Sequence, residues 1–284
     1  MKRATIVVPV YNEATHIGQC LESLRSQSYR DATFLILDNC STDCSFQIIA
    51  EFCKKDDRFI GIRHPKNLGA SLNSVYGYSL CDTEYVAFIG AHDYISQGLI
   101  ASQVSILDAN QSLSMVSGLP YTVDELGQAK PRETAVYDFK DENRAVRYAK
   151  SVAQLNDCTI FQSMFRSKYL HLFDLMKCCV LHGDHITISQ LLWHGNLAYD
   201  PSEIYYRREY NANGQGENKR VERIVGTTRF ALNNQDFINA YLASCQSLIK
   251  NLPNGRDQFL AWVKDTLHKR FNVSTSISAG ANPE

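Results

Sequence analysis

The chain has 284 residues, of which 44% are hydrophobic and 21% charged, a composition typical of a globular protein of one or two domains. Its 29 basic and 30 acidic residues leave a net charge of −1, so overall charge does not draw it to nucleic acid or to an anionic membrane, and we expect no nucleic-acid partner. No apolar run approaches the roughly 18 residues of a membrane span, so we expect no transmembrane segment and at most peripheral membrane contact.

The cysteines and the N-terminal segment bear on the compartment. The nine cysteines follow no framework spacing, and the first residues, MKRATIVVPVYNE, contain too short an apolar stretch for a signal peptide. We therefore predict reduced thiols and a cytoplasmic location, with any membrane contact limited to the surface.

Strand and helix patterns alternate over the first 110 residues. Apolar, β-branched runs predict strands at 4–10, 32–38, 59–64 and 84–90. Helical spacing predicts helices over 17–24, over a segment that Ser41 or Asp43 would cap and that carries Phe46, Ile49 and Phe52, and over 71–80. This alternation predicts right-handed crossovers and a mostly parallel, Rossmann-like α/β sheet flanked by helices, with a ligand crevice at the carboxyl ends of its strands.

Three groups of residues fall at those carboxyl ends. They are residues 11–13, 38–39 and 91–93, which include two aspartates, a glutamate and a histidine. Because the carboxyl ends of parallel strands meet at one edge of a sheet, we expect these groups to converge in one crevice.

The pattern changes after residue 110. We expect a hairpin over 115–133 that turns near Gly127, a helix over 141–155, a helix over 186–195 that Gly195 ends, and an extended edge segment over 197–208 that contains Pro201. Residues 211–220 form a polar loop, either a lid or a disordered segment.

The C-terminal part reads as a helical extension. Residues 228–270 are expected to be helical, with Phe259, Trp262, Val263 and Leu267 on one face, followed by a frayed tail. We therefore predict a main domain over 1–220, divided into a nucleotide-sugar half (1–110) and an acceptor half (111–220), and a helical extension over 221–284.

A dinucleotide-binding oxidoreductase is the obvious alternative for such a sheet, but it needs a glycine-rich turn after the first strand, where this chain has PVYNE. Instead, IVVPVYNEATHIGQC, LILDNCSTDC, HPKNLGASLNS and EYVAFIGAHDYIS follow one another at the spacing of a known family, and HGDHITISQLLWHG and IYYRREYNANG follow later. This ordered set resembles the inverting family-2 glycosyltransferases of GT-A fold, over residues 3 to about 213.

The resemblance implies a nucleotide-sugar donor, with uridine diphosphate the favoured nucleotide. The donor-binding residues would be Pro9, Tyr11, Glu13, Asp38, Asn67, Gly69, Ala91, His92, Asp93, Arg207 and Arg208. Among them Asp38 would accept a hydrogen bond from the base or the ribose. Taken alone, Asp38 would be read as a helix cap, but its place in the ordered motifs favours the donor role.

The family's Asp-x-Asp motif is altered here. Members of the family use it to hold the ribose and a divalent cation, Mn²⁺ or Mg²⁺, that bridges the donor diphosphate, but Gly90 and His92 replace the two aspartates. Two alternatives remain open: a rebuilt cation site made of His92, Asp93 and Glu209, or direct neutralisation of the diphosphate by Arg207, Arg208 or protonated His92.

Asp184 stands where the family's Glu-Asp pair provides the catalytic base, with Gly183 in place of the Glu. An inverting transfer needs one carboxylate that takes the proton from the acceptor hydroxyl, so the resemblance assigns this role to Asp184. The simpler interpretation is an N-cap for the helix that begins at 186. His182 and His185 flank Asp184 without an HExxH pattern or a matching cysteine pair, and we expect them to be exposed loop residues near an acceptor pocket.

The sequence thus predicts an enzyme, an inverting glycosyltransferase that moves a sugar from a UDP-sugar to a hydroxyl of a glycan or lipid-linked glycan, as in polysaccharide biosynthesis. One alternative is a degenerate, non-catalytic nucleotide-sugar binder, which the loss of both Asp-x-Asp carboxylates favours and the retained Asp184 opposes. A nucleotidyltransferase would need paired metal carboxylates that the sequence does not offer.

Overall fold

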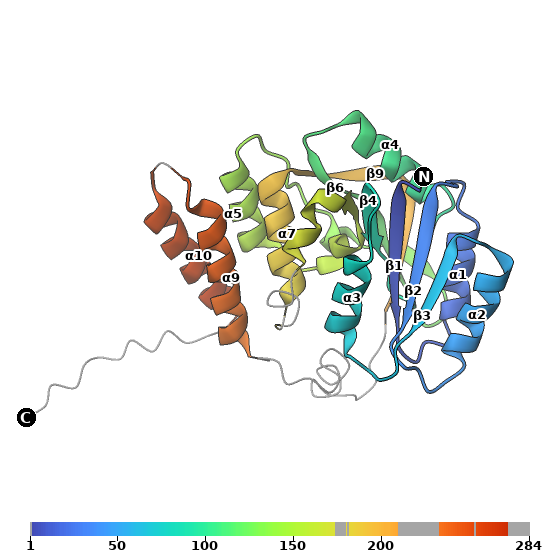
Figure 1. Cartoon of the computed structure of the whole chain (residues 1–284). Helices are drawn as coiled ribbons and strands as arrows, with labels where there is room; N and C mark the ends of the chain where they lie inside the picture. The colour runs from blue at the N-terminus through green and yellow to red at the C-terminus, as the bar shows by residue number, and fades with distance from the viewer. Residues whose placement is uncertain (1, 174–179, 181, 210–232, 253, 272–284) are drawn as a thin grey trace, which may run out of the picture.

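The computed structural model describes residues 2–173, 180, 182–209, 233–252 and 254–271. Within them the strands form one mixed sheet in the order β3-β2-β1-β4-β8-β6-β9-β5, with β7 paired to β6 (Figure 1). The strands are β1 (Ala4–Val10), β2 (Ala32–Asp38), β3 (Phe59–Arg63), β4 (Tyr85–Phe88), β5 (Tyr94–Ile95), β6 (Leu113–Val123), β7 (Ala129–Pro131), β8 (Met164–Arg166) and β9 (Asn196–Arg208). The α/β class predicted from the sequence is confirmed.

The N-terminal half is parallel, as the alternating pattern predicts. β1 pairs in parallel with β2 and β4, and β2 pairs in parallel with β3. Three helices follow the first three strands: α1 (Ile17–Arg25), α2 (Ser45–Lys55) and α3 (Ala70–Ser79). The Asp43 carboxylate accepts from the backbone N–H of Ser45 at 2.9 Å, so Asp43, of the two candidates, contacts the first turn of α2.

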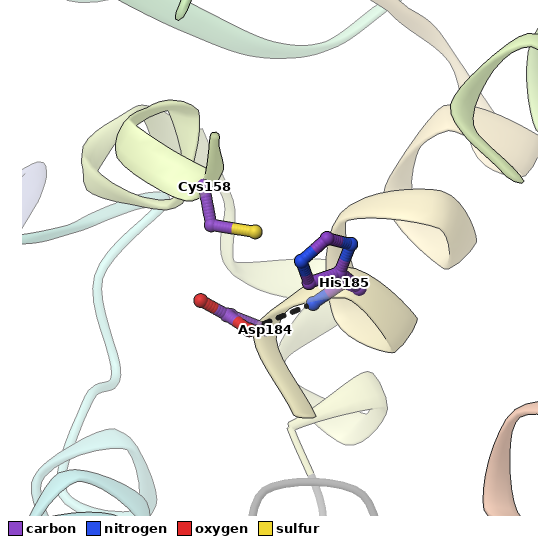
Figure 2. Close-up of side chains that lie close together, drawn as sticks. All are labelled: Cys158, Asp184 and His185. Carbon is purple, nitrogen blue, oxygen red and sulfur yellow. Dashed lines mark hydrogen bonds between the residues drawn. The ribbon is translucent and has the colours of Figure 1, made fainter. Parts of the chain in front are cut away.

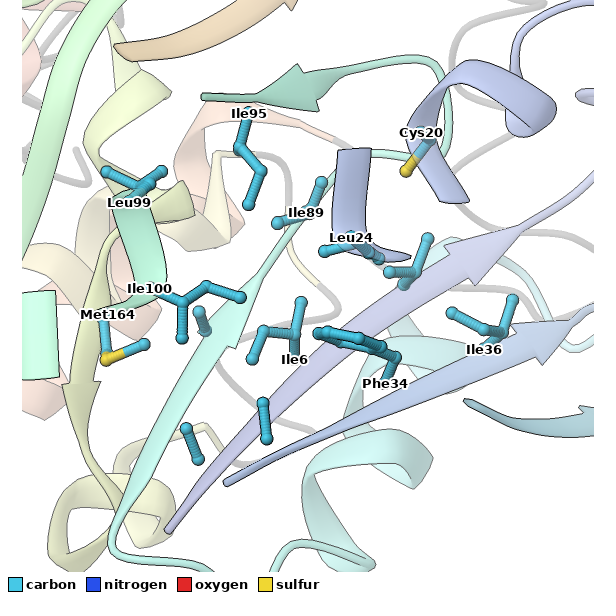
Figure 3. Packing of buried hydrophobic residues seen from close by; sticks show 14 of the residues in the cluster. Ile6, Cys20, Leu24, Phe34, Ile36, Ile89, Ile95, Leu99, Ile100 and Met164 are labelled. Atoms are coloured by element: carbon cyan, nitrogen blue, oxygen red, sulfur yellow. The ribbon is translucent and has the colours of Figure 1, made fainter. Parts of the chain in front are cut away.

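Both faces of this half are covered, which explains its continuous apolar runs. Ile6 and Phe34 face a core shared with α1 and with α4 (Leu99–Ala109), as Figure 3 shows. Val7, on the opposite face of β1, packs in a second core with Tyr78 of α3. β1 is apolar apart from Thr5, which is 5% exposed and hydrogen-bonded to Thr83, so the carboxyl end of the strand is the first place where it can present polar groups to a ligand.

The second half adds antiparallel strands and one long central strand. β8 pairs antiparallel with β4 and β6, and the predicted hairpin is present as β6 and β7 around Gly127, whose φ is 78°. The expectation of an edge segment at 197–208 is wrong, because β9 pairs with β6 on one side and with β5 on the other. Its register shifts between the pairs Gly118–Asp200 and Leu119–Ile204, so Pro201, which has no N–H to donate, lies in the irregularity.

Four further helices pack beside the second half. They are α5 (Arg144–Gln154), α7 (Gly183–His194), α9 (Asn234–Ile249) and α10 (Arg256–Arg270). α7 begins three residues earlier than expected, because Gly183, Asp184 and His185 form its first turn. The expected helix over 228–270 appears, in its described part, as α9 and α10, which share a core with α5 and α7 at the end of the molecule opposite β3 (Figure 1).

The predicted apolar face of the last helix is only partly correct. Val263 and Leu267 are fully buried, whereas Trp262 is 41% exposed. The loop at 211–220 and the tail at 274–284 lie outside the described residues. No helix in the described part of the chain has both the length and the apolar character needed to cross a membrane.

Candidate functional site

The carboxyl end of β2 holds a buried carboxylate with a spare acceptor. Asp38 is fully buried, and its Oδ2 accepts from the backbone N–H of Ser41 at 3.2 Å and lies 3.2 Å from Nε of Arg63. Its Oδ1 is buried without a hydrogen-bond partner among the described residues. A buried acceptor without a partner is costly, so an N–H or O–H group from a ligand would satisfy it.

The carboxyl end of β1 lies beside Asp38 and is held in a fixed shape. Pro9 and Tyr11 are partly buried, and Glu13 is 5% exposed with its backbone N–H bonded to Ser45 Oγ at 2.8 Å. Asn12 takes a left-handed conformation, with φ of 55°, and this turns the chain toward α1.

The turn before α3 is hydrogen-bonded to the end of β2. Gly69 has φ of 84°, which favours glycine, and its N–H donates to Asn67 Oδ1 at 2.8 Å. The side chain of Asn39 donates to the same Oδ1 and accepts from the N–H of Leu68. The turn is thus tied to the end of β2, and it positions the first turn of α3.

The loop after β4 carries the altered Asp-x-Asp positions. Ala91 is 3% exposed, and a Cβ at Gly90 would lie 2.7 Å from Asp93 Oδ2. Asp93 itself is 2% exposed: its Oδ2 accepts from Tyr205 Oη at 2.6 Å, and its Oδ1 accepts from the backbone N–H of Arg208 at 2.8 Å. Asp93 therefore ties the loop to β9, and burial raises the pKa of its carboxyl.

These contacts do not fit a divalent cation at the family's position. The space of the first aspartate is filled by Asp93, both of whose oxygens are engaged, and His92 Nδ1 lies 3.3 Å from Glu13 Oε1. Glu209 pairs with Arg132 at 2.8 Å. The assignment of His92, Asp93 and Glu209 to a metal stays a prediction, and we derive no step through a cation.

Asp184 lies in the first turn of α7 and lines a pocket of about 700 Å³. Its Oδ1 accepts from the backbone N–H of His185 at 3.0 Å, which orients the carboxylate. The same pocket is lined by Arg207 and by Ala70 and Ser71 of α3. The pocket thus joins the predicted base to one predicted donor contact and borders the turn at residues 67–69.

One of the two histidines beside Asp184 differs from expectation. His185 is on α7 and 8% exposed, so the prediction of an exposed loop residue is wrong for it, because the helix begins before 186. His182 precedes the helix as its N-cap in a left-handed conformation, with φ of 57°.

A charged network beside the pocket was not found from the sequence. Asp157 accepts from Arg132 Nε at 2.5 Å and from Arg207 Nη1 at 3.1 Å, and it caps the short helix η2 (Cys158–Gln162) by accepting from the N–H of Thr159. Burial alone would raise the pKa of the Asp157 carboxyl, but the hydrogen bonds from Thr159 and Arg132 outweigh burial and lower this pKa. Arg207 therefore reaches the pocket from an anchored position.

Cys158 is a second residue that the sequence analysis missed. Among the described residues, Cys158, Asp184 and His185 are a group whose possible metal-ligating atoms all lie within 4.8 Å of one another (Figure 2). Burial, together with the nearby Asp184, raises the pKa of the Cys158 thiol well above its usual value, and burial lowers the pKa of His185 to about 4. No motif spacing joins residues 158 and 184, which explains why the group was overlooked.

The site and the fold define a class. A Rossmann-like sheet with a buried, unsatisfied carboxylate at one strand end belongs to the class of α/β domains that bind ligands at the carboxyl ends of their strands. The family model described as glycosyl transferase family 2 matches residues 5–173, and the chain belongs to that family.

Similar proteins agree with this membership. The chain is 26% identical over 169 residues to the uncharacterized glycosyltransferase MJ1057 of Methanocaldococcus jannaschii, covering 58% of this chain and 56% of that protein. It spans between 14% and 56% of the lengths of three curated relatives.

Solved structures share the fold. S. aureus TarS 1–349, in complex with UDP-GlcNAc, superposes with a TM-score of 0.64 at 18% identity, covering 94% of this chain and 73% of that one. The mannosyltransferase PcManGT from Pyrobaculum calidifontis, with GDP-Man and Mn²⁺, has a TM-score of 0.55 at 14% identity, covering 99% and 76%. At these identities the likeness concerns the fold, which is GT-A.

Proposed function

We propose that this chain transfers a sugar from a nucleoside-diphosphate sugar, with uridine as the base, to a hydroxyl of a glycan or lipid-linked glycan, with inversion at the anomeric carbon. The observation that carries this proposal is the shared pocket. Asp184 and Arg207 line it together, and its wall includes the first turn of α3, directly after the turn at residues 67–69 that is bonded to the end of β2.

The donor side rests on Asp38. Its buried Oδ1 can accept the imide N–H of a uracil or a ribose hydroxyl, and either bond would satisfy an acceptor that has no other partner among the described residues. Tyr11 and Glu13 lie at the neighbouring strand end. The structural neighbour TarS binds UDP-GlcNAc, which agrees with a uridine donor.

The chemistry requires one base and no covalent intermediate. The Asp184 carboxylate takes the proton of the acceptor hydroxyl as its oxygen attacks the anomeric carbon from the face opposite the leaving diphosphate. Asp184 lies in the first turn of α7, where its carboxylate can face the pocket that would hold the acceptor hydroxyl. Arg207, held by Asp157, can offset the charge that develops on the diphosphate.

The test replaces Asp184 with Asn, which keeps the shape and one oxygen but cannot accept the proton. Turnover should fall by about 10² to 10⁴, the usual contribution of a general base, while calorimetric affinity for the donor stays unchanged. Asp236→Asn is the matched control, because Asp236 occupies the first turn of α9 and lies outside the pocket. Equal turnover in the wild type and Asp184→Asn would remove the base from the proposal.

A non-catalytic sugar-nucleotide binder is the second candidate, and one observation favours it. A Cβ at Gly90 would lie 2.7 Å from Asp93 Oδ2, which leaves no room there for the family's first aspartate. Donor binding without turnover in the wild-type protein, and without any effect of Asp184→Asn, would favour this candidate.

A further inference from the structure

The side chains of Cys158, Asp184 and His185 point toward one another from two elements. Cys158 opens the short helix η2, and the other two residues lie in the first turn of α7 (Figure 2). One ligand atom from each lies within 4.8 Å of the others. A tetrahedral ion bound at the usual distances needs ligand atoms about 3.5 Å apart, so small side-chain rotations suffice to close the group.

The ligand set selects among metals. A thiolate, an imidazole and a carboxylate are the three side-chain ligands of zinc, whereas Mg²⁺ and Ca²⁺ prefer oxygen alone. The group therefore suits a different ion from the Mn²⁺ or Mg²⁺ that would accompany a sugar nucleotide.

The surroundings leave the group open to a ligand. All three residues line the pocket of about 700 Å³, so a fourth coordination position would face its interior. The His185 ring, although 8% exposed, makes no hydrogen bond to another residue in the described part of the chain. The Asp184 carboxylate is already oriented by the N–H of His185, as outer hydrogen bonds orient metal ligands.

We propose that Cys158, Asp184 and His185 form a binding site for Zn²⁺, and that the bound ion blocks sugar transfer by occupying Asp184. On binding, the thiol releases its proton to solvent and the thiolate, the carboxylate and a neutral ring nitrogen each donate an electron pair, with no change of oxidation state. The proposed inhibition by Zn²⁺ rests on the proposed role of Asp184 as the base, whereas the proposed binding of Zn²⁺ does not.

Co²⁺, used in place of Zn²⁺, tests the binding without any turnover. Titrated into the full chain, Co²⁺ should produce a thiolate-to-cobalt charge-transfer band in the near ultraviolet, and added Zn²⁺ should abolish it. Cys158→Ser should lose the band and weaken Zn²⁺ binding by more than about 100-fold, the upper range for loss of an outer-shell partner alone. Cys81→Ser is the matched control, since Cys81 is a partly buried thiol outside the pocket.

His185→Asn gives a second variant, which should keep the thiolate band but bind Co²⁺ more weakly. A wild-type protein without the band, or a Cys158→Ser protein that keeps both band and affinity, overturns the site. If bound Zn²⁺ inhibits the enzyme, Zn²⁺ should slow sugar transfer by the wild type and a chelator should restore the rate. Sugar transfer by Cys158→Ser should be slowed less by the same concentration of Zn²⁺. Equal inhibition of the wild type and Cys158→Ser by Zn²⁺ overturns the proposed inhibition. If the protein shows no transferase activity, the cobalt titration still tests metal binding on its own.

Discussion

Replacing Asp157 with Asn should separate the anchoring of two arginines from the capping of η2. An Asn can still accept from the N–H and Oγ1 of Thr159, but its NH₂ group would face Arg132 Nε, where Asp157 Oδ2 now accepts at 2.5 Å. Loss of a hydrogen bond to a charged group costs about 1.5–3 kcal/mol, and Arg132 and Asp157 are only 20% and 9% exposed. Arg207 is 37% exposed, so solvent screening limits its pair to at most about 1 kcal/mol.

The sum predicts a loss of about 1.5–4 kcal/mol in the free energy of unfolding, measured by urea denaturation at pH 7 with an unchanged m-value. Donor affinity should fall as well, because Arg207 loses its anchor. Asp56→Asn is the comparison, since Asp56 pairs with the buried Arg58 at 2.7 Å outside the pocket and should cost stability without changing donor affinity. A loss below about 0.5 kcal/mol in Asp157→Asn, the range of ordinary surface substitutions, would refute the reasoning.

Three further outcomes are expected. Gly90→Asp, which restores the family's residue, should lower the free energy of unfolding by about 2 kcal/mol or more, because its Cβ would lie 2.7 Å from Asp93 Oδ2. Gly18→Ala is the control, because a Cβ at Gly18 would meet nothing within 4 Å and should not lower this free energy. Equal effects of the two substitutions in urea denaturation would contradict the prediction. The Arg3 guanidinium lowers the pKa of Asp108 to about 2, so its stabilising effect is complete above the unfolded-state pKa near 3.9 and is lost as the pH falls through the folded-state pKa. Asp108→Asn should therefore cost about 1 kcal/mol at pH 7, after discounting for exposure, and progressively less as the pH falls through about 2, and a pH-independent difference in unfolding free energy would refute the assignment. The affinity for the donor, measured by calorimetry, should be equal in Mn²⁺, Mg²⁺ and EDTA, because the residues at 90–93 do not fit a cation. A loss of donor binding in EDTA would instead support a cation site made of His92, Asp93 and Glu209.

The first half of the sheet could be predicted because its signal is local. β1 and β2 are buried on both faces, so their positions are apolar except for Thr5, Thr33 and the terminal Asp38, and each strand stands out in the sequence. The pairing of β9 could not be predicted, since its alternating residues and Pro201 suit an edge strand equally well. Only its contacts with β6 and β5, which come from distant parts of the chain, decide the question.

The candidate site divides in the same way. Asp38 and Asp184 could be proposed because each stands in an ordered motif. The Asp157 network could not, because its partners lie 25 and 50 residues away and no local pattern links them. The orientation of the Asp93 side chain could not be predicted either, because it depends on a hydrogen bond from the hydroxyl of Tyr205, far away in the sequence.

The tie between Asp93 and Tyr205 also sets an order of events during synthesis. Among the described strands β5 pairs only with β9, and the Asp93 carboxylate accepts from Tyr205, 112 positions later in the chain, and from the N–H of Arg208. The loop after β4 therefore leaves the ribosome long before the strand that fixes it, and contacts so distant in sequence close slowly. Before β9 is synthesised, β1–β4 can assemble, so a nascent chain would complete the parallel half of its sheet first and the pocket beside Arg207 last.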